Sequence, residues 1–411
     1  MAKRNPLIVG LDIGTFKVGV VVAEVNDQGV EITGIGWAPS GTGLRKGTVV
    51  NIDTTVEAIK KAVEEAELMA GCEIASVVVG SAGSHLKGFN SHGVVAVKTR
   101  EVGPEDVERV VEAARAVALP MDREVLHVLP QEFVVDDQDG VKDPVGMAGV
   151  RLEARVHIVT GQISSGENII KCCNRAGLRV VDVLGAPLAA AQAVLTAEER
   201  ELGVAVIDVG AGTTAVGVYH SDTILHSAVL PVGGGNVTND LAAALRTPFA
   251  DAERLKQRHA VAVASSASAD ACVEVAGVGG RPAHRLSPRA LAEVTEPRAE
   301  EILALVRSDI ERAGCLGRLT SGVVLTGGGA VLTGMAELAE RVFRVPARLG
   351  QPLHLSGLVD VVASPMYSTA VGLVLHELNR ESGSGRRRGR PMAGSLGRAG
   401  QTVLGWLKEL F

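Results

Sequence analysis

The chain has 411 residues, of which 46% are hydrophobic, and its net charge at pH 7 is −6. This length exceeds one ordinary hydrophobic core and predicts two to four domains, while no apolar run reaches the roughly 18 residues that a membrane span needs. The acidic balance, without an aromatic-rich basic stripe, argues against nucleic acid as a partner. The first residues lack the apolar core of a signal peptide, so we expect the protein to act inside the cell.

The first predicted element is a β-hairpin over residues 7–22, whose turn contains Asp12, Gly14 and Thr15. A strand that ends on a carboxylate and continues into glycine and threonine is typical of a loop that grips a polyphosphate, because glycine lets backbone N–H groups approach phosphate oxygens. Asp12 would repel phosphates unless a hydrated Mg²⁺ lay between them. Lys17 would supply countercharge to the phosphates. The alternative for one such loop alone is a plain hairpin with a glycine turn.

Strand and helix patterns alternate up to residue 84 and return after residue 160. We therefore predict a first α/β half made of residues 5–84 and 161–198, interrupted by an inserted subdomain at 85–160. The predicted helices in this part cover residues 54–70, 104–118, 166–176 and 187–195, and a strand covers 179–183. The second of these helices opens on a proline and acidic residues, which suit a helix N-terminus.

A second hairpin over residues 204–218 repeats the design of the first. Its first strand ends on a carboxylate, and two glycines and two threonines follow: Asp208, Gly210, Gly212, Thr213 and Thr214. Two copies of one pattern argue against the plain-hairpin alternative. Asp12 and Asp208 are together predicted to hold the Mg²⁺ through water.

A third glycine cluster, Gly327, Gly328 and Gly329, follows a strand-like run and precedes a predicted helix over 333–343. Strand–glycine–helix corners are common, so this cluster alone is weak evidence. In third place after two phosphate loops, it predicts the platform for an adenosine.

The order of these motifs resembles the superfamily of actin, sugar kinases and DnaK-type chaperones. Four stretches are also similar to the FtsA family of bacterial cell-division proteins: residues 130–133, 143–147, 149–157 and 367–373. This resemblance runs from about residue 6 to 378 and returns in the tail. It implies an α/β, actin-like ATPase fold, in which two α/β halves enclose a nucleotide cleft and each carries an inserted subdomain. The implied ligands are ATP and Mg²⁺.

The family architecture implies four subdomains: IA at 5–84 and 161–198, IC at 85–160, IIA at 199–241 and 301–380, and IIB at 242–300. By similarity to the superfamily, Glu253 and Lys256 on the predicted helix 248–259 are candidates for the nucleoside pocket. The alternative for these two side chains is a solvated, charged helix face.

The last sixteen residues, 396–411, are predicted to form an amphipathic helix after a flexible basic linker at 381–395. On a helical wheel the large apolar side chains share one face: Leu396, Val403, Leu404, Trp406, Leu407, Leu410 and Phe411. Such a face with tryptophan and phenylalanine is typical of a helix that lies in a membrane interface. The linker arginines would attract anionic lipids, although the same apolar stripe would also suit docking onto the protein body or a partner helix.

Residues 186–191 read Ala-Pro-Leu-Ala-Ala-Ala, where DnaK-type chaperones have Glu-Pro-Thr-Ala-Ala-Ala. The position of the carboxylate that orients the attacking water is therefore alanine. Gln192 would replace it only in another register. We expect ATP binding with weak or no hydrolysis.

The FtsA resemblance implies an adaptor that polymerises with itself on the cytoplasmic face of the inner membrane, at the division septum. It implies that the C-terminal peptide of the tubulin-like protein FtsZ docks on subdomain IIB, where Arg281, Arg285 and Arg289 form a candidate basic patch, or else solvated loop arginines. Later division proteins would contact subdomain IC. Two alternatives are an ATP-dependent small-molecule kinase, for which no catalytic Asp or His stands out, and a pilus-assembly relative of FtsA, which has no evident use for the tail.

Overall fold

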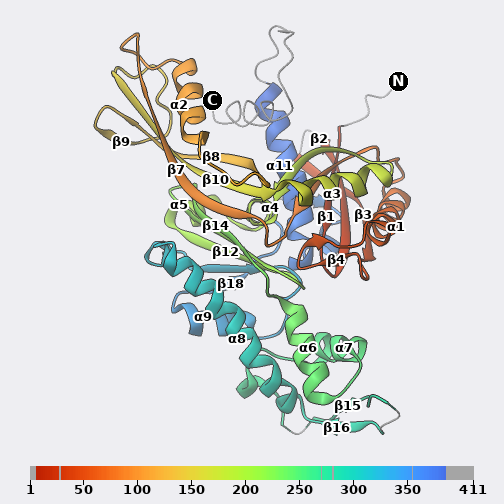
Figure 1. Ribbon diagram of the computed structural model, residues 1–411. Coiled ribbons are helices and arrows are strands. Elements are labelled where there is room, and N and C mark those ends of the chain that lie inside the picture. Colours follow the sequence, from red (N-terminus) through yellow and green to blue (C-terminus); the bar gives the residue numbers. More distant parts are fainter. Residues whose placement is uncertain (1–5, 27–28, 270, 280–281, 354, 386–411) are drawn as a thin grey trace.

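The computed structural model describes residues 6–385, apart from 27–28, 270, 280–281 and 354, and is drawn in Figure 1. Its two large sheets repeat one strand order. In the first sheet the antiparallel meander β1 (Leu7–Ile13), β2 (Lys17–Asn26) and β3 (Gly29–Pro39) is extended on the β1 side by parallel β6 (Ser76–Ser81) and β11 (Arg179–Gly185).

The second sheet contains the same arrangement. Its meander is β12 (Val204–Val209), β13 (Thr214–His220) and β14 (Thr223–Leu230), extended by parallel β17 (Val323–Thr326) and β18 (Ala347–Leu349). Each of the two predicted phosphate loops is thus the first hairpin turn of its own sheet. Both predicted hairpins are confirmed.

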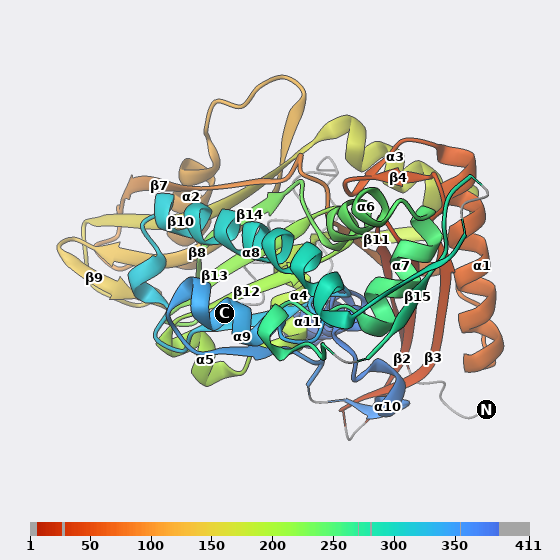
Figure 2. The same ribbon diagram turned by 90° about the horizontal axis from the view of Figure 1, so that it is seen from below.

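Helices cover these sheets because most strand residues are apolar on both faces. On the outer side of the first sheet lie α1 (Ile52–Ala70) and α3 (Ile163–Arg175), and on that of the second lie α8 (Pro288–Arg312) and α9 (Met335–Phe343). Figure 2 shows α8 running across β12, β13 and β14. The predicted helices at 54–70, 166–176 and 333–343 are confirmed to within three residues at each end.

Two helices, α4 (Ala186–Val194) and α11 (Ser368–Gly385), lie between the sheets and share one apolar core with strands of both halves. They approach so closely that a Cβ built on Gly372 would lie 1.7 Å from the carbonyl oxygen of Ala189. This helix pair therefore joins the two halves of the molecule. It also confirms the helix predicted at 187–195.

Residues 85–160 contain α2 (Pro104–Arg115) and the strands β7 (Lys87–Ala96), β8 (Arg123–Val135), β9 (Gln138–Val141) and β10 (Arg151–Gln162). In sequence this unit is inserted into the first half. Its strands nevertheless extend the second sheet, in which β7 lies next to β14. The backbone pairing there is a single residue pair, Ala228 with Lys87. Sequence periodicity does not predict this placement.

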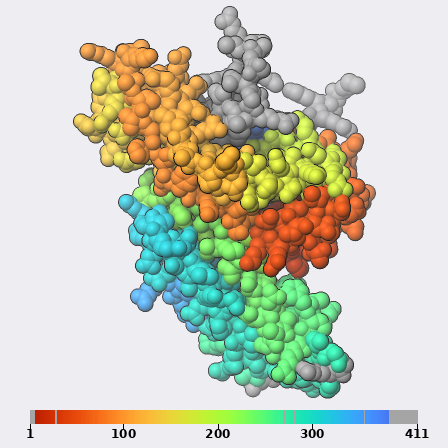
Figure 3. All heavy atoms as spheres, in the orientation of Figure 1, coloured from red at the N-terminus to blue at the C-terminus, as the bar shows by residue number. Residues whose placement is uncertain are grey.

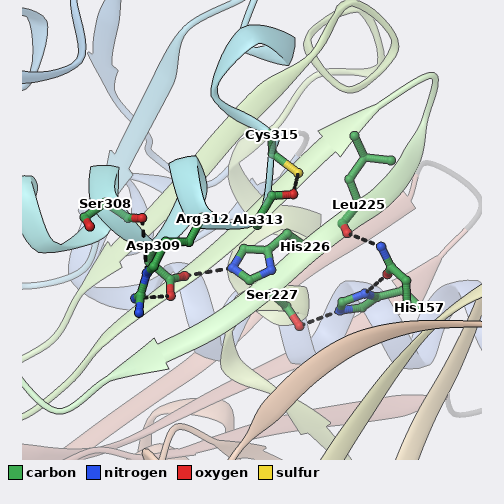
Figure 4. Close-up of polar contacts among 10 residues, drawn as sticks. His157, Leu225, His226, Ser227, Ser308, Asp309, Arg312, Ala313 and Cys315 are labelled. Atoms are coloured by element: carbon green, nitrogen blue, oxygen red, sulfur yellow. Dashed lines mark hydrogen bonds and ion pairs between the residues drawn. The ribbon is translucent and has the colours of Figure 1, made fainter.

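Side chains complete the junction between β14 and the inserted unit (Figure 4). His157 of β10 bonds to Oγ of Ser227 at 2.8 Å. Outside this view, Nε2 of Gln131 donates to the carbonyl oxygen of Ile224 at 2.7 Å. Burial lowers the pKa of His157 to about 3, so this histidine is neutral. His127 of β8 is likewise buried.

The other end of the molecule carries α6 (Gly234–Leu245), α7 (Phe249–His259) and a small hairpin of β15 (Val273–Val275) and β16 (His284–Leu286). Figure 3 shows this end and the orange inserted unit at opposite ends of the molecule. The predicted boundaries of subdomain IIB fall inside elements, since residues 241–242 lie in α6 and residues 300–301 in α8. A different helix thus runs through each of the two predicted boundaries, which a shift in composition does not reveal.

The remaining short elements are β4 (Leu44–Arg45), β5 (Thr48–Val49), α5 (Ala197–Leu202), β19 (Ser356–Gly357) and α10 (Val359–Val362), with single 3₁₀ turns at 264–266, 316–318 and 365–367. The predicted start of the linker at residue 381 is wrong, because α11 continues to Gly385. The serine and glycine residues at 382–385 occupy the last turn of α11, where helix propensity matters least. The predicted tail helix lies outside the described residues, and no helix in the described ranges is long and apolar enough to cross a membrane.

Candidate nucleotide site

The two predicted phosphate loops have the same backbone geometry. In the first, the N–H of Gly14 donates to the carbonyl oxygen of Lys17 at 3.0 Å, and in the second Gly210 donates to Thr213 at 2.9 Å. Each turn follows a strand that ends one residue beyond its aspartate. The repeated sequence pattern therefore corresponds to a repeated structure.

The structure brings all three glycine motifs together. A Cβ built on Gly212 would lie 2.6 Å from Oγ1 of Thr15, so the two loops touch each other. A Cβ on Gly327, which has a φ of +85°, would lie 2.1 Å from Oδ1 of Asp208. The third cluster packs against the second loop because β12 and β17 are parallel neighbours, with Asp208 paired to Thr326.

Asp12 and Asp208 are both buried within this cluster. Burial raises the pKa of Asp12 to about 7, and the negative charge of Asp208 adds to the rise while Lys17 opposes it. Burial also raises the pKa of Asp208, against a hydrogen bond from Oγ1 of Thr369 at 2.7 Å. One or two carboxylates with several waters are the usual protein contribution to a Mg²⁺ site beside phosphates.

Lys17 is the strongest sign of an anionic ligand. Its Nζ atom is buried and has no hydrogen-bond partner among the described residues, and it lies 3.9 Å from the centroid of the Tyr367 ring. Burial lowers the pKa of Lys17, while the charge of Asp12 opposes this. A buried ammonium with three unused donors is costly unless a ligand satisfies them. A polyphosphate between the two loops would do so.

Glu253 and Lys256 are held next to the third glycine cluster. Nζ of Lys256 donates to Oε2 of Glu253 at 2.8 Å and to the carbonyl oxygen of Gly234 at 3.1 Å. A Cβ on Gly234 would lie only 3.4 Å from Cα of Gly329. The Lys256 side chain is 15% exposed and the Glu253 side chain 14% exposed, which argues against a solvated helix face.

Sequence analysis missed two parts of this site. The first is the run from Gly233 to Gly235 at the start of α6, where the N–H of Gly234 donates to the carbonyl oxygen of Gly210 and that of Gly235 to the carbonyl oxygen of Ala211, both at 2.8 Å. Three consecutive glycines before a helix were a usable signal. The second is the turn at 365–369, for which no local signal exists, because its role depends on contacts with distant residues.

The start of α4 confirms an apolar first turn. Ala186 is buried and packs with Ala215 near the second loop. Gln192 points elsewhere, since its Oε1 accepts from Asn379 of α11 at 3.4 Å. The register in which Gln192 would replace a catalytic carboxylate is not the one observed.

The candidate arginines for a peptide partner lie on the small hairpin and the start of α8. Arg285 is exposed on β16, opposite Glu274 of β15. Arg289 of α8 lies 3.9 Å from Glu293. A neighbouring hollow between α7 and β15 is lined in part by Arg254 and Arg258, whereas Arg281 lies outside the described residues.

Comparison with known proteins decides the family. A sequence model described as "SHS2 domain inserted in FTSA" matches residues 83–160, and one described as "Cell division protein FtsA" matches 205–372. The chain is 50% identical to "Cell division protein FtsA" of Pseudomonas aeruginosa, covering 92% of this chain and 91% of that protein. It is 42% identical to the Escherichia coli K12 protein of the same name, covering 100% and 99%. The chain belongs to the FtsA family of cell-division proteins.

Solved structures support the fold. The chain of a "PilM-PilN type IV pilus biogenesis complex" superposes with a TM-score of 0.64 at 18% identity, covering 90% of this chain and 98% of that one. MreB5 of Spiroplasma citri bound to ADP superposes with a TM-score of 0.57 at 14% identity, covering 93% and 99%. These likenesses confirm the actin-like fold. Identities of 42–50% to FtsA proteins favour the cell-division family over a kinase or a pilus-assembly protein.

Proposed function

We propose that this FtsA-family protein binds MgATP between its two phosphate loops, polymerises on the cytoplasmic face of the inner membrane and ties FtsZ to it at the septum. The observation that carries the nucleotide proposal is the buried Lys17 ammonium, which has no hydrogen-bond partner among the described residues and interacts electrostatically with the buried Asp12. Asp12 and Asp208 would hold Mg²⁺ through water. Gly14, Thr15, Gly210, Gly212, Thr213 and Thr214 would surround the phosphates, and Gly327–Gly329, Glu253 and Lys256 would line the nucleoside.

Mg²⁺ would supply positive charge between the phosphates and the two aspartates, and the protein residues would position it. Thr369 already orients one oxygen of Asp208. The glycines of the two turns carry no Cβ, so no side chain at these positions would block the approach of a phosphate. The residues present therefore fit a hydrated magnesium–polyphosphate group.

Turnover is expected to be slow, because the first turn of α4 offers Ala186, Pro187 and Leu188 where a water-orienting side chain would be needed. We expect isothermal titration to show Mg²⁺-dependent ATP binding, while phosphate release in a single turnover is slower than nucleotide exchange. The rate of nucleotide exchange is measured separately on the ADP-bound protein at the same protein concentration. Phosphate release that outpaces exchange would show that another residue supplies the catalytic function.

The tail proposal rests on sequence, because residues 396–411 lie outside the described residues. The large apolar side chains of this face, if partly buried in lipid, would contribute several kcal/mol at roughly 25 cal/mol per Å². One tail would then bind reversibly, and a polymer would bind firmly through avidity. This links self-assembly and membrane attachment in one physical argument.

The FtsZ contact is proposed for the end that carries α7 and the β15–β16 hairpin, where Arg285 and Arg289 lie with Arg254 and Arg258 nearby. Guanidinium groups suit the carboxylates of an acidic peptide, which would compete here with Asp251 and Glu274 of the same hollow. Contacts with later division proteins are proposed for residues 85–160, at the opposite end of the molecule (Figure 3). The two partner surfaces would thus be well separated.

A further inference from the structure

Tyr367 lies in the 3₁₀ turn Pro365–Tyr367 that leads into α11. Contacts with the second half fix this turn. The carbonyl oxygen of Pro365 accepts from the N–H of Gly327 at 3.1 Å, and Oγ of Ser368 accepts from Oγ1 of Thr326 at 2.7 Å. The next residue, Thr369, donates to Asp208. The turn therefore belongs, by its contacts, to the second phosphate loop and the third glycine cluster.

The Tyr367 ring, however, packs on a residue of the first loop. Nζ of Lys17 lies 3.9 Å from the ring centroid, a geometry in which the ring quadrupole attracts a cation. The same Nζ is buried and makes no hydrogen bond to any residue that the structure describes. The ring thus holds the ammonium without using any of its three N–H donors, which a hydrogen-bonding side chain in its place would occupy.

We propose that Tyr367 is a positioning residue for the nucleotide phosphates: its ring fixes the Lys17 ammonium of one half against the phosphate loop of the other. This inference rests on the MgATP binding proposed above and assigns a residue to it. Because the turn is tied to Thr326, Gly327 and Asp208, the ring places the countercharge at a set position relative to the second carboxylate. The ammonium is then preorganised when the nucleotide binds.

The test compares Tyr367→Leu, which removes the ring, with Tyr367→Phe, which keeps it. MgATP affinity is measured by isothermal titration on the full chain. We expect Tyr367→Leu to weaken binding about 3- to 30-fold and Tyr367→Phe to change it less than about 2-fold. In a Lys17→Met background, Tyr367→Leu should cause no further loss, which shows that it acts through Lys17.

A second measurement does not depend on tolerance of leucine at this site. Phenylalanine with one, two and three ring fluorines at position 367 keeps the ring shape and progressively weakens its quadrupole. We expect a stepwise loss of MgATP affinity along the series. Equal affinities along the series, or wild-type affinity in Tyr367→Leu, would overturn the role of Tyr367 while leaving MgATP binding intact. A wild-type protein that binds no MgATP would overturn the proposed function and this inference together.

Discussion

Replacing Asp12 with asparagine is expected to stabilise the nucleotide-free protein at pH 8 and to remove most of its Mg²⁺-dependent ATP affinity. Burial and the nearby Asp208 raise the folded-state pKa of Asp12 from 3.8 to about 7. Between these two values the folded state keeps a proton that the unfolded state has lost. Stability therefore falls as the pH rises from about 4 to 7, and it stays reduced above pH 7.

The size of this effect follows from about 1.4 kcal/mol per pKa unit, which gives about 4 kcal/mol at pH 8. Asparagine has nearly the same shape and carries no charge, so the variant avoids this cost. It also loses the carboxylate that Mg²⁺ and its waters require. For the wild type, the same linkage predicts that MgATP affinity weakens as the pH falls below about 7, because Asp12 must then release a proton.

Urea unfolding of both proteins at pH 5.5, 6.5, 7.5 and 8.5, without nucleotide, measures the stability term. The free energies of unfolding should diverge as the pH rises, with the variant more stable. Asp137→Asn is the matched control, because Asp137 is fully exposed. Its free energy of unfolding should follow that of the wild type at every pH. Parallel curves for Asp12→Asn and wild type would contradict the buried, proton-holding carboxylate.

Gly372→Ala is expected to lower the free energy of unfolding by more than about 3 kcal/mol. The added Cβ would lie 1.7 Å from the backbone oxygen of Ala189, so α4 and α11 would have to separate. Their shared core also contains strands of both halves, and this spreads the disturbance across the cleft. A backbone atom cannot move aside as the end of a flexible side chain can.

Gly166→Ala in α3 is the control for this prediction. It is also a glycine inside a helix, but a Cβ there would meet its nearest atom, Oε1 of Glu124, at 3.6 Å, which is ordinary contact. Because alanine favours helix over glycine, this variant should be unchanged or up to about 1 kcal/mol more stable. Thermal unfolding of the two variants side by side decides the matter, and equal shifts would refute the close helix contact.

The sequence predicted those parts of the fold that depend on neighbours along the chain. A carboxylate, glycine and threonine between two β-rich runs identified both hairpins, and the structure joins them through Thr15 and Gly212. Helix existence was predictable in the same way. Helix ends were less so, as α11 shows by continuing through Gly385 into residues predicted as linker.

Features that depend on distant residues gave no local signal. Tyr367 meets Lys17 only because α11 returns between the two sheets, 350 positions along the chain. The inserted unit docks on β14 through one backbone pair and a few side chains, and no periodicity encodes this. The three glycines at 233–235 were visible, but their contact with Gly210 depends on how α6 enters the fold.

The most direct test of the adaptor proposal is co-sedimentation of FtsZ with anionic lipid vesicles, the full-length protein and MgATP. The account predicts that FtsZ pellets with the vesicles. A version truncated before Leu396 should leave both proteins in solution, and the Arg285→Glu, Arg289→Glu double variant should pellet without FtsZ. Full-length protein that ignores the vesicles, or binds them and leaves FtsZ in solution, would contradict the proposal.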